Sequence, residues 1–199
     1  MLIKINRTDC LNAFAVFPLR NYNYEKEEEE IYYPAVFKSY LLTVSSRSFR
    51  SHVMAMGKQL AKMTEFFNID SLIFLGDTDR PWQYRNIEYK AAREAKLYLT
   101  SNKIGKKFNG ALQVDRTALP VFIRHLSWLT RCNAALPYIH FTDAEQQLLG
   151  HICQYGNLHF HSLDEKMDSA LQAYIAQSRF IYVADNKCHN QFSNNSITG

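Results

Sequence analysis

The sequence of 199 residues lacks long apolar runs and the motifs of several common enzyme classes. No stretch approaches the ~18 uninterrupted apolar residues of a membrane-spanning helix, and the first ten residues lack the order of a signal peptide. The four cysteines form no CxxC pair, so neither a zinc knuckle nor a dithiol motif is indicated. A glycine-rich dinucleotide loop and a P-loop are also missing, which argues against a dehydrogenase or a P-loop ATPase. We therefore expect a cytoplasmic protein with reduced thiols.

The composition is that of a folded domain. Apolar residues make up 47%, aromatic residues 14% and charged residues 21% of the chain, which is enough apolar material for a sizeable core. We expect one domain over residues 1–199, with its core in 34–184 and a polar tail in 185–199.

The charge is unevenly distributed. The net charge is only +4, but five of the 19 acidic residues fall within residues 25–30. Between Lys38 and Lys107 there are 13 basic and six acidic residues, a surplus of seven positive charges. This surplus indicates either a polyanionic partner or an ordinary solvated face.

Hydrophobic patterning predicts an α/β fold. Residues 40–44 are apolar and β-branched, and a helical stripe of apolar residues at steps of three and four follows Ser48. The run 71–75 is continuously apolar, as in a strand that is covered on both faces. Strand, helix and strand in this order predict a Rossmann-like three-layer fold with a mainly parallel sheet.

Further elements are predicted along the chain. A second helix is expected over 87–105, and two S/T-x-x-E capping boxes predict helices over 143–154 and 164–178. The glutamate run and the residues after it, 25–34, are expected to form a loop. A last apolar stretch covers 180–184.

Several polar residues have both a chemical and a structural interpretation. Ser45 follows the first strand, where it is either a nucleophile near a helix N-terminus or part of a helix cap. Asp77 and Asp79 follow the next strand, as Mg²⁺ ligands or as turn residues. His159 and His161 share one face of a probable strand, but no third ligand is evident, so we expect paired histidines and no metal site.

A basic surface is predicted on the helix that follows the second strand. Its residues are spaced to follow a phosphate backbone, and each neutralised phosphate would release counterions. They are Lys90, Arg93 and Lys96, followed by Lys103, Lys106 and Lys107.

The order of these segments resembles the tRNA-dependent cyclodipeptide synthases. In that family an apolar strand ends in a nucleophilic serine and a polar turn, as in YLLTVSSRSF, and the next strand ends in an aspartate-containing loop, as in SLIFLGDTDRP. A tyrosine and a basic, alanine-containing helix that reaches an asparagine come next. The matching residues here are Tyr84, Ile87, Tyr89, Ala91, Ala95 and Asn102.

The resemblance covers residues 40–107 well, and it implies roles for individual residues. Ser45 matches the nucleophile, and Leu41 and Ile73 match the apolar positions that line the pocket for the first aminoacyl group. Ser48 matches a turn position that is asparagine in one subfamily. The implied fold is similar to the catalytic domain of tyrosyl and tryptophanyl tRNA synthetases.

The late part of the chain supplies the remaining implied residues. The family's catalytic tyrosine best matches Tyr174, and Ser178 stands at the position of the family's glutamate. The implied chemistry is attack of Ser45 on the ester of an aminoacyl-tRNA, then transfer to a second aminoacyl-tRNA and cyclisation to a diketopiperazine. Tyr174 would position the substrate amine or relay a proton.

The resemblance thus implies a monomeric enzyme with two aminoacyl-tRNAs as substrates, no membrane and no cofactor, since the ester is already activated. Two other functions remain open at this point. One is a non-catalytic tRNA- or RNA-binding module with the same scaffold. The other is a Mg²⁺-dependent phosphotransferase that uses Asp77 and Asp79.

Overall fold

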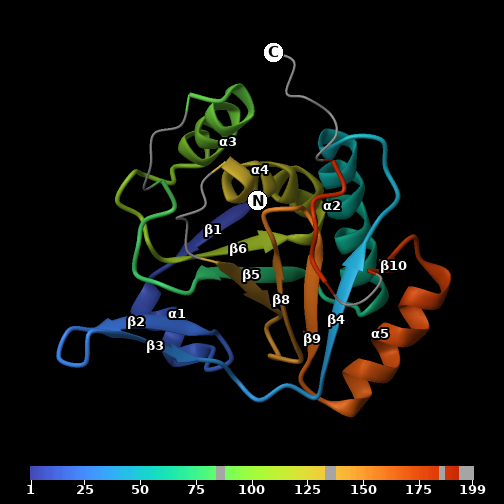
Figure 1. Cartoon of the computed structure of the whole chain (residues 1–199), viewed down its shortest axis with the longest axis horizontal. Coiled ribbons are helices and arrows are strands. Elements are labelled where there is room, and N and C mark those ends of the chain that lie inside the picture. The colour runs from blue at the N-terminus through green and yellow to red at the C-terminus, as the bar shows by residue number, and fades with distance from the viewer. Residues whose placement is uncertain (84–87, 133–137, 184–186, 193–199) are drawn as a thin grey trace.

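The fold is built on one large antiparallel sheet. A computed structural model describes residues 1–83, 88–132, 138–183 and 187–192 (Figure 1). Eight strands form the sheet in the order β1-β6-β5-β7-β8-β9-β4-β10, and each neighbouring pair is antiparallel. The strands are β1 (Leu2–Ile5), β6 (Ala111–Asp115), β5 (Ser71–Gly76), β7 (Ile139–Thr142), β8 (Leu148–Ile152), β9 (Leu158–Ser162), β4 (Lys38–Thr43) and β10 (Ile181–Tyr182). The prediction of a mainly parallel Rossmann sheet is therefore wrong.

The error lies in which strands are neighbours. Strands β4 and β5 were expected to lie together across the crossover helix, but β7, β8 and β9 lie between them. Four antiparallel steps leave β4 and β5 pointing in the same direction, so the carboxyl ends of both strands do reach one edge of the sheet. At ~4.8 Å per strand these ends are about 19 Å apart.

Helices cover one face of the sheet. They are α2 (Phe49–Phe66), α3 (Lys90–Ser101), α4 (Leu119–Cys132) and α5 (Glu165–Gln177). The predicted apolar stripe of α2 is confirmed, because Val53, Met56, Leu60 and Met63 are fully buried. Side chains of all four helices share one apolar cluster with alternate residues of the sheet, such as Phe160.

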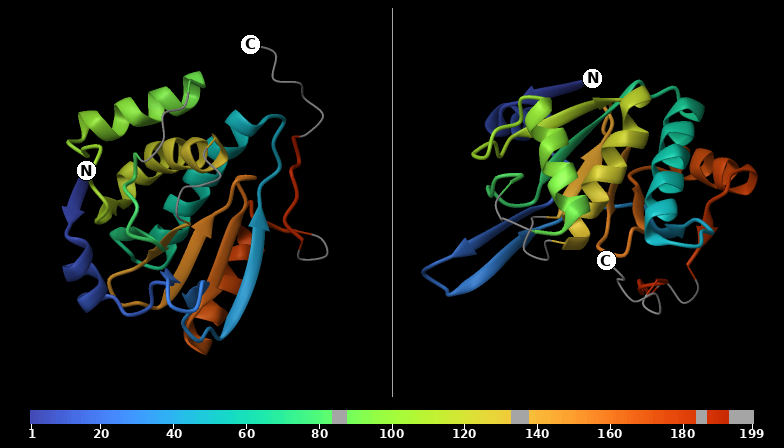
Figure 2. Two further views of the ribbon diagram at one scale, coloured as in Figure 1. Left: turned by 60° about the vertical axis from the view of Figure 1, so that its left-hand side comes forward. Right: turned by 90° about the horizontal axis from the view of Figure 1, so that it is seen from above.

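The opposite face is covered only in part. Helix α1 (Arg7–Ala13) and the chain after it pack Cys10 and Phe17 against Ile73 and Leu75 of β5. A hairpin of β2 (Leu19–Asn23) and β3 (Glu28–Tyr32) follows and extends away from the main sheet (Figure 2). Residues 25–34 are thus partly strand rather than loop. Over β7, β8 and β9 this face carries the cavity described below.

The predicted helix over 143–154 is also wrong, since this segment forms a turn and then β8. The side chain of Asp143 accepts the backbone N–H groups of Glu145, Gln147 and Leu148. Gln146 adopts a φ of 54°, which belongs to a turn and not to a helix. Asp143, which lies inside the capping box expected over 142–145, thus closes the β7–β8 hairpin, and no helix begins here.

Other predicted elements hold with shifted ends. The helix over 164–178 is confirmed as α5, and Asp164 caps it by accepting the N–H of Met167. The basic helix predicted over 87–105 is the shorter α3, Lys90–Ser101. Its expected start at Ile87 lies outside the described residues. The apolar stretch 180–184 contains the two-residue strand β10, with Ala184 outside that description.

None of the described helices combines the length and apolar character that crossing a bilayer requires.

Candidate functional site

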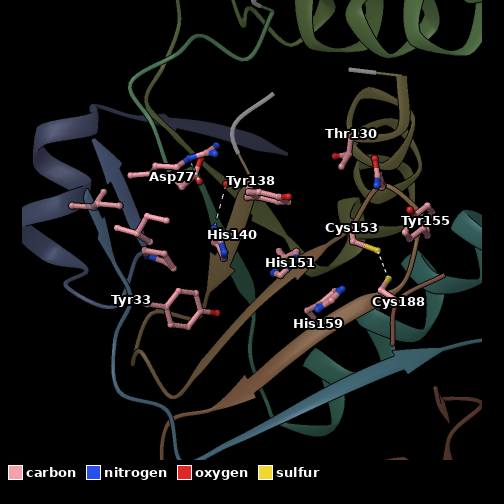
Figure 3. Close-up of a pocket in the computed structure, with 15 residues that line it drawn as sticks. Tyr33, Asp77, Thr130, Tyr138, His140, His151, Cys153, Tyr155, His159 and Cys188 are labelled. Atoms are coloured by element: carbon pink, nitrogen blue, oxygen red, sulfur yellow. Dashed lines mark hydrogen bonds and ion pairs between the residues drawn. The ribbon is translucent and has the colours of Figure 1, made fainter. Parts of the chain in front are cut away.

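A cavity of about 460 Å³ lies against the partly open face of the sheet. Its floor consists of side chains from β7, β8 and β9, and its walls come from the β2–β3 hairpin, the end of α4 and the segment 187–192 (Figure 3). Strand alternation explains the polar floor. In β9 the apolar Leu158 and Phe160 point into the helix-covered core, so His159 points to the other face.

Three imidazoles form a row across this floor. The strand register places His140 opposite His151 and His151 opposite His159. The rings of His151 and His159 are stacked, with centroids 4.3 Å apart and planes 12° apart, and the His140 ring meets the His151 ring edge-on at 5.0 Å. His161 lies one step further along β9, where its ring nitrogens contact the hydroxyls of Ser39 and Tyr33.

Burial keeps this row neutral. Burial, together with a smaller effect of neighbouring imidazoles, lowers the pKa of His140 to about 3 and that of His161 to about 4. The pKa values of His151 and His159 are also lowered, again chiefly by burial. Neutral imidazole is the form that binds metals.

Two cysteines meet His159 at one end of the cavity. The sulfur atoms of Cys153 and Cys188 are 3.1 Å apart, and they lie with a ring nitrogen of His159 within 4.8 Å of one another. Within the described part of the chain this is the one group of at least three histidine, cysteine or acidic residues with metal-binding geometry. Figure 3 shows the three side chains side by side, apart from Asp77 and Tyr138 at the other end of the cavity.

The geometry of the β8–β9 turn holds Cys153 in this place. The N–H of Cys153 donates to the carbonyl of Asn157, and the N–H of Gly156 donates to the carbonyl of Cys153. Gly156 has a φ of +83°, and a Cβ atom there would lie 2.8 Å from Cδ2 of the buried His52. Glycine therefore allows the tight turn that pairs Cys153 with Asn157, directly before β9.

Local hydrogen bonds favour a charged sulfur, while burial opposes it. Burial, together with the smaller effect of the nearby Cys188, raises the pKa of the Cys153 thiol to about 12. The backbone N–H groups of Tyr155 and Asn157 act in the opposite direction. The Asn157 side chain also donates to the Cys188 sulfur at 3.4 Å. A bound cation would supply the missing stabilisation of the thiolates.

The other end of the cavity is closed by an ion pair. Arg20 Nε lies 3.1 Å from Asp77 Oδ2, and the Arg20 backbone N–H donates to the Asp77 carbonyl. Burial raises the pKa of Asp77, against the effect of Arg20. Asp77 thus ties the hairpin to the carboxyl end of β5, and the described residues show no cluster of three or more ligands in which it joins Asp79.

The predicted serine site lies elsewhere. Ser45 and Ser178 line a second cavity, a groove of about 620 Å³ that also contains Lys58 and Arg179. Ser45 is exposed, whereas the Ser178 hydroxyl donates to the Ile175 carbonyl and accepts the N–H of Phe180.

Tyr174 is buried beside this groove and does not line it. Its hydroxyl donates to the carbonyl of Gln59 at 3.1 Å, and its ring packs on Phe66 and Phe67. The fold therefore brings Ser45 and Ser178 to one groove, but the Tyr174 hydroxyl is engaged with helix α2.

The two predicted pocket residues do not meet. Leu41 is in β4 and Ile73 is in β5, with three strands between them, so one aminoacyl side chain does not contact both. Ser48 caps α2 through a reciprocal pair of hydrogen bonds with Ser51, and Ser46 contacts the ring of His52 at 3.2 Å. No sequence pattern distinguished Ser46 from its neighbours.

The predicted basic residues lie on and after α3. Lys90, Arg93 and Lys96 belong to the helix, and Lys106 is close enough to lower the pKa of Lys96, whose main shift comes from desolvation. The backbone carbonyl of Lys103 accepts from the Lys4 side chain, and Lys107 is exposed. Tyr84 and Ile87, on which the family resemblance partly rests, lie outside the described residues.

No protein-family model, curated protein or solved structure matches this chain. The resemblance to cyclodipeptide synthases therefore stays a prediction. The cluster of Cys153, His159 and Cys188 escaped the sequence analysis because its residues have no metal-site spacing and one of them comes from the predicted polar tail. The paired histidines of β9 were the one available signal.

Proposed function

We propose that the protein binds one zinc ion through Cys153, His159 and Cys188 and uses it to activate water for hydrolysis of a small molecule in the cavity. The observation that carries this proposal is the convergence of two thiols and an imidazole nitrogen within 4.8 Å at the wall of a 460 Å³ cavity.

The donor set favours zinc. Thiolate and imidazole ligands suit Zn²⁺ better than the hard ions Mg²⁺ and Ca²⁺. Three protein ligands leave one of four tetrahedral positions for water or substrate, which is the arrangement of catalytic zinc sites. A zinc ion held by these residues would lower the pKa of its water to about 7 and so would supply hydroxide near neutral pH.

The cavity favours a small, largely uncharged substrate. Its walls include Leu19, Ile31, Tyr33 and Tyr138, its imidazoles are neutral, and Arg20 is paired with Asp77 at the far end.

Metal titration of the purified chain tests the proposal. We expect one zinc per chain, with affinity at least ~100-fold weaker in Cys188→Ser and His159→Asn, since even second-sphere changes cost up to that much. Cys132→Ser is the matched control, because Cys132 lies at the end of α4 and outside the metal cluster. Hydrolysis of p-nitrophenyl acetate that chelation abolishes and zinc restores would support the catalytic part. Zinc affinity unchanged by Cys188→Ser would overturn the assignment.

A second candidate function is aminoacyl transfer from tRNA at the groove. It is favoured by one observation, that Ser45 and Ser178 line the same groove with the cations Lys58 and Arg179. No described hydrogen bond engages the Ser45 hydroxyl, so it is available as a nucleophile. Because the sheet is antiparallel, this candidate rests on the residues and not on a Rossmann fold.

Labelling by radioactive aminoacyl-tRNA tests this second candidate. Ser45→Ala should abolish the label, while Ser39→Ala, outside the groove, should retain it. Diketopiperazines in cells that express the chain would support the synthase. tRNA binding without label or product would favour the non-catalytic RNA-binding alternative instead.

The basic face on α3 has its own test. Replacing Lys90, Arg93 and Lys96 with glutamine should weaken tRNA binding and flatten its salt dependence. An unchanged salt slope would place any RNA contact elsewhere on the molecule.

A further inference from the structure

The Cys153 and Cys188 sulfur atoms are 3.1 Å apart, a separation between those of two well-defined chemical states. In a disulfide the two sulfurs are ~2.05 Å apart. Two thiolates on one tetrahedral zinc, each at ~2.3 Å from the metal, are about 3.8 Å apart. Either state is reached by a shift of about 1 Å or less, without rebuilding the turn.

From this pair we propose that Cys153 and Cys188 form a reversible disulfide under peroxide, and that disulfide formation releases the zinc. The zinc half of this inference rests on the proposed function. The disulfide half rests only on the two sulfurs and on their access to the cavity.

The reaction balances with a peroxide as oxidant. One thiolate attacks an oxygen of hydrogen peroxide, so an S–O bond forms as the O–O bond breaks, which gives a sulfenic acid and one hydroxide. The second thiolate then forms the S–S bond as the S–O bond breaks, which releases a second hydroxide. The two sulfurs together give up two electrons, and two protons from the solvent convert the two hydroxides to water. The disulfide no longer provides thiolate ligands, so His159 is the one ligand of the cluster that remains. A single imidazole does not retain the zinc, and the Zn²⁺ dissociates.

Position singles out this pair among the four cysteines. Both sulfurs belong to residues that line the cavity, which gives peroxide a route to them. Cys10 belongs to α1 and is fully buried against the sheet, and Cys132 lies at the end of α4. Among the described contacts, no second sulfur lies beside Cys10 or Cys132.

The segment that carries Cys188 stays attached in either state. Gln191 donates to the Thr43 hydroxyl at 3.0 Å, and the Phe192 ring lies 5.2 Å from the buried His52 ring. Oxidation is therefore expected to empty the metal site while the fold persists, which is what reversibility requires.

The experiment treats the zinc-loaded chain with one equivalent of hydrogen peroxide and measures zinc release with a chromogenic chelator. Peptide mass mapping then locates any disulfide, and dithiothreitol followed by zinc should restore the starting state. We expect one zinc released and one Cys153–Cys188 disulfide per chain. Cys132→Ser should behave as wild type, and Cys188→Ser should give no intramolecular disulfide.

The same treatment is applied to the metal-free chain, and the two samples together separate the two proposals. In the zinc-loaded chain, zinc that is not released, or a disulfide that maps to other cysteines, overturns the switch and leaves the zinc assignment standing. A Cys153–Cys188 disulfide in a chain that never binds zinc overturns the proposed function and supports the disulfide half.

Discussion

Replacing His140 with leucine should remove about 2 kcal/mol of the acid sensitivity of the protein, which is the share of one buried imidazole. His140 is 5% exposed, and burial lowers its pKa to about 3, against an ordinary value of 6.5. Because the folded pKa lies below the unfolded one, the unfolded chain binds more protons between about pH 3 and 6.5. The contribution of the neutral His140 to the free energy of unfolding is therefore fully present above pH 6.5 and is lost as the pH falls through this window.

The magnitude follows from the two pKa values. At pH 5 the pH lies about 1.5 units below the unfolded-state pKa of this imidazole, and each unit corresponds to about 1.4 kcal/mol. Acidification from about pH 7.5 to pH 5 therefore stabilises the unfolded state by about 2 kcal/mol through this group. The figure changes little as long as the folded pKa lies below about 4. In His140→Leu the Tyr138 carbonyl still accepts the N–H of Asp77, so the substitution removes the titration without orphaning that oxygen.

Urea unfolding at the two pH values, with EDTA present to exclude metal, measures this difference. The fall in the free energy of unfolding on acidification should be about 2 kcal/mol smaller in His140→Leu than in wild type. His189→Gln is the matched control, because His189 is exposed, and it should show the wild-type fall. An undiminished fall in His140→Leu would refute the claim that burial of this imidazole drives acid sensitivity.

Two further predictions concern the elements that carry the sites. Gly150→Ala should destabilise the fold by about 1–3 kcal/mol, because its Cβ would lie 2.5 Å from Cζ of the fully buried Phe141. Urea unfolding should show Gly105→Ala close to wild type, since nothing lies within 4 Å of the added carbon, and equal losses in the two variants would contradict the steric argument. Ser48→Ala should cost about 1 kcal/mol in thermal or urea unfolding by removing the cap of α2, and no measurable loss would show that Ser51 suffices alone.

The sequence predicted elements better than their arrangement. The stripe of α2 and the apolar runs of β4 and β5 are local signals, and the structure confirms them. Their neighbours in the sheet depend on the hairpins β7–β8 and β8–β9, whose pairing is set between distant residues. The helix predicted over 143–154 is wrong because the T-x-x-E pattern at 142–145 does not cap a helix: the side chain of Asp143 accepts backbone N–H groups of a turn.

The candidate metal site was not predicted from the sequence. The sequence placed His159 and His161 on one face of a strand and favoured paired histidines without a metal, and of the two only His159 belongs to the cluster. The β8–β9 pairing places Cys153 near His159, and the segment 187–192 places Cys188 beside them. Both contacts depend on the tertiary fold, so they produce no recognisable spacing of ligands in the sequence.

X-ray absorption of the zinc-loaded chain tests the central claim most directly. The account predicts one zinc with two sulfur neighbours at ~2.3 Å, one imidazole nitrogen at ~2.0–2.1 Å and one further light atom. In Cys188→Ser one sulfur neighbour should be lost. A shell of oxygen and nitrogen alone, or a protein that holds no stoichiometric zinc, would contradict the assignment of Cys153, His159 and Cys188 as a metal centre.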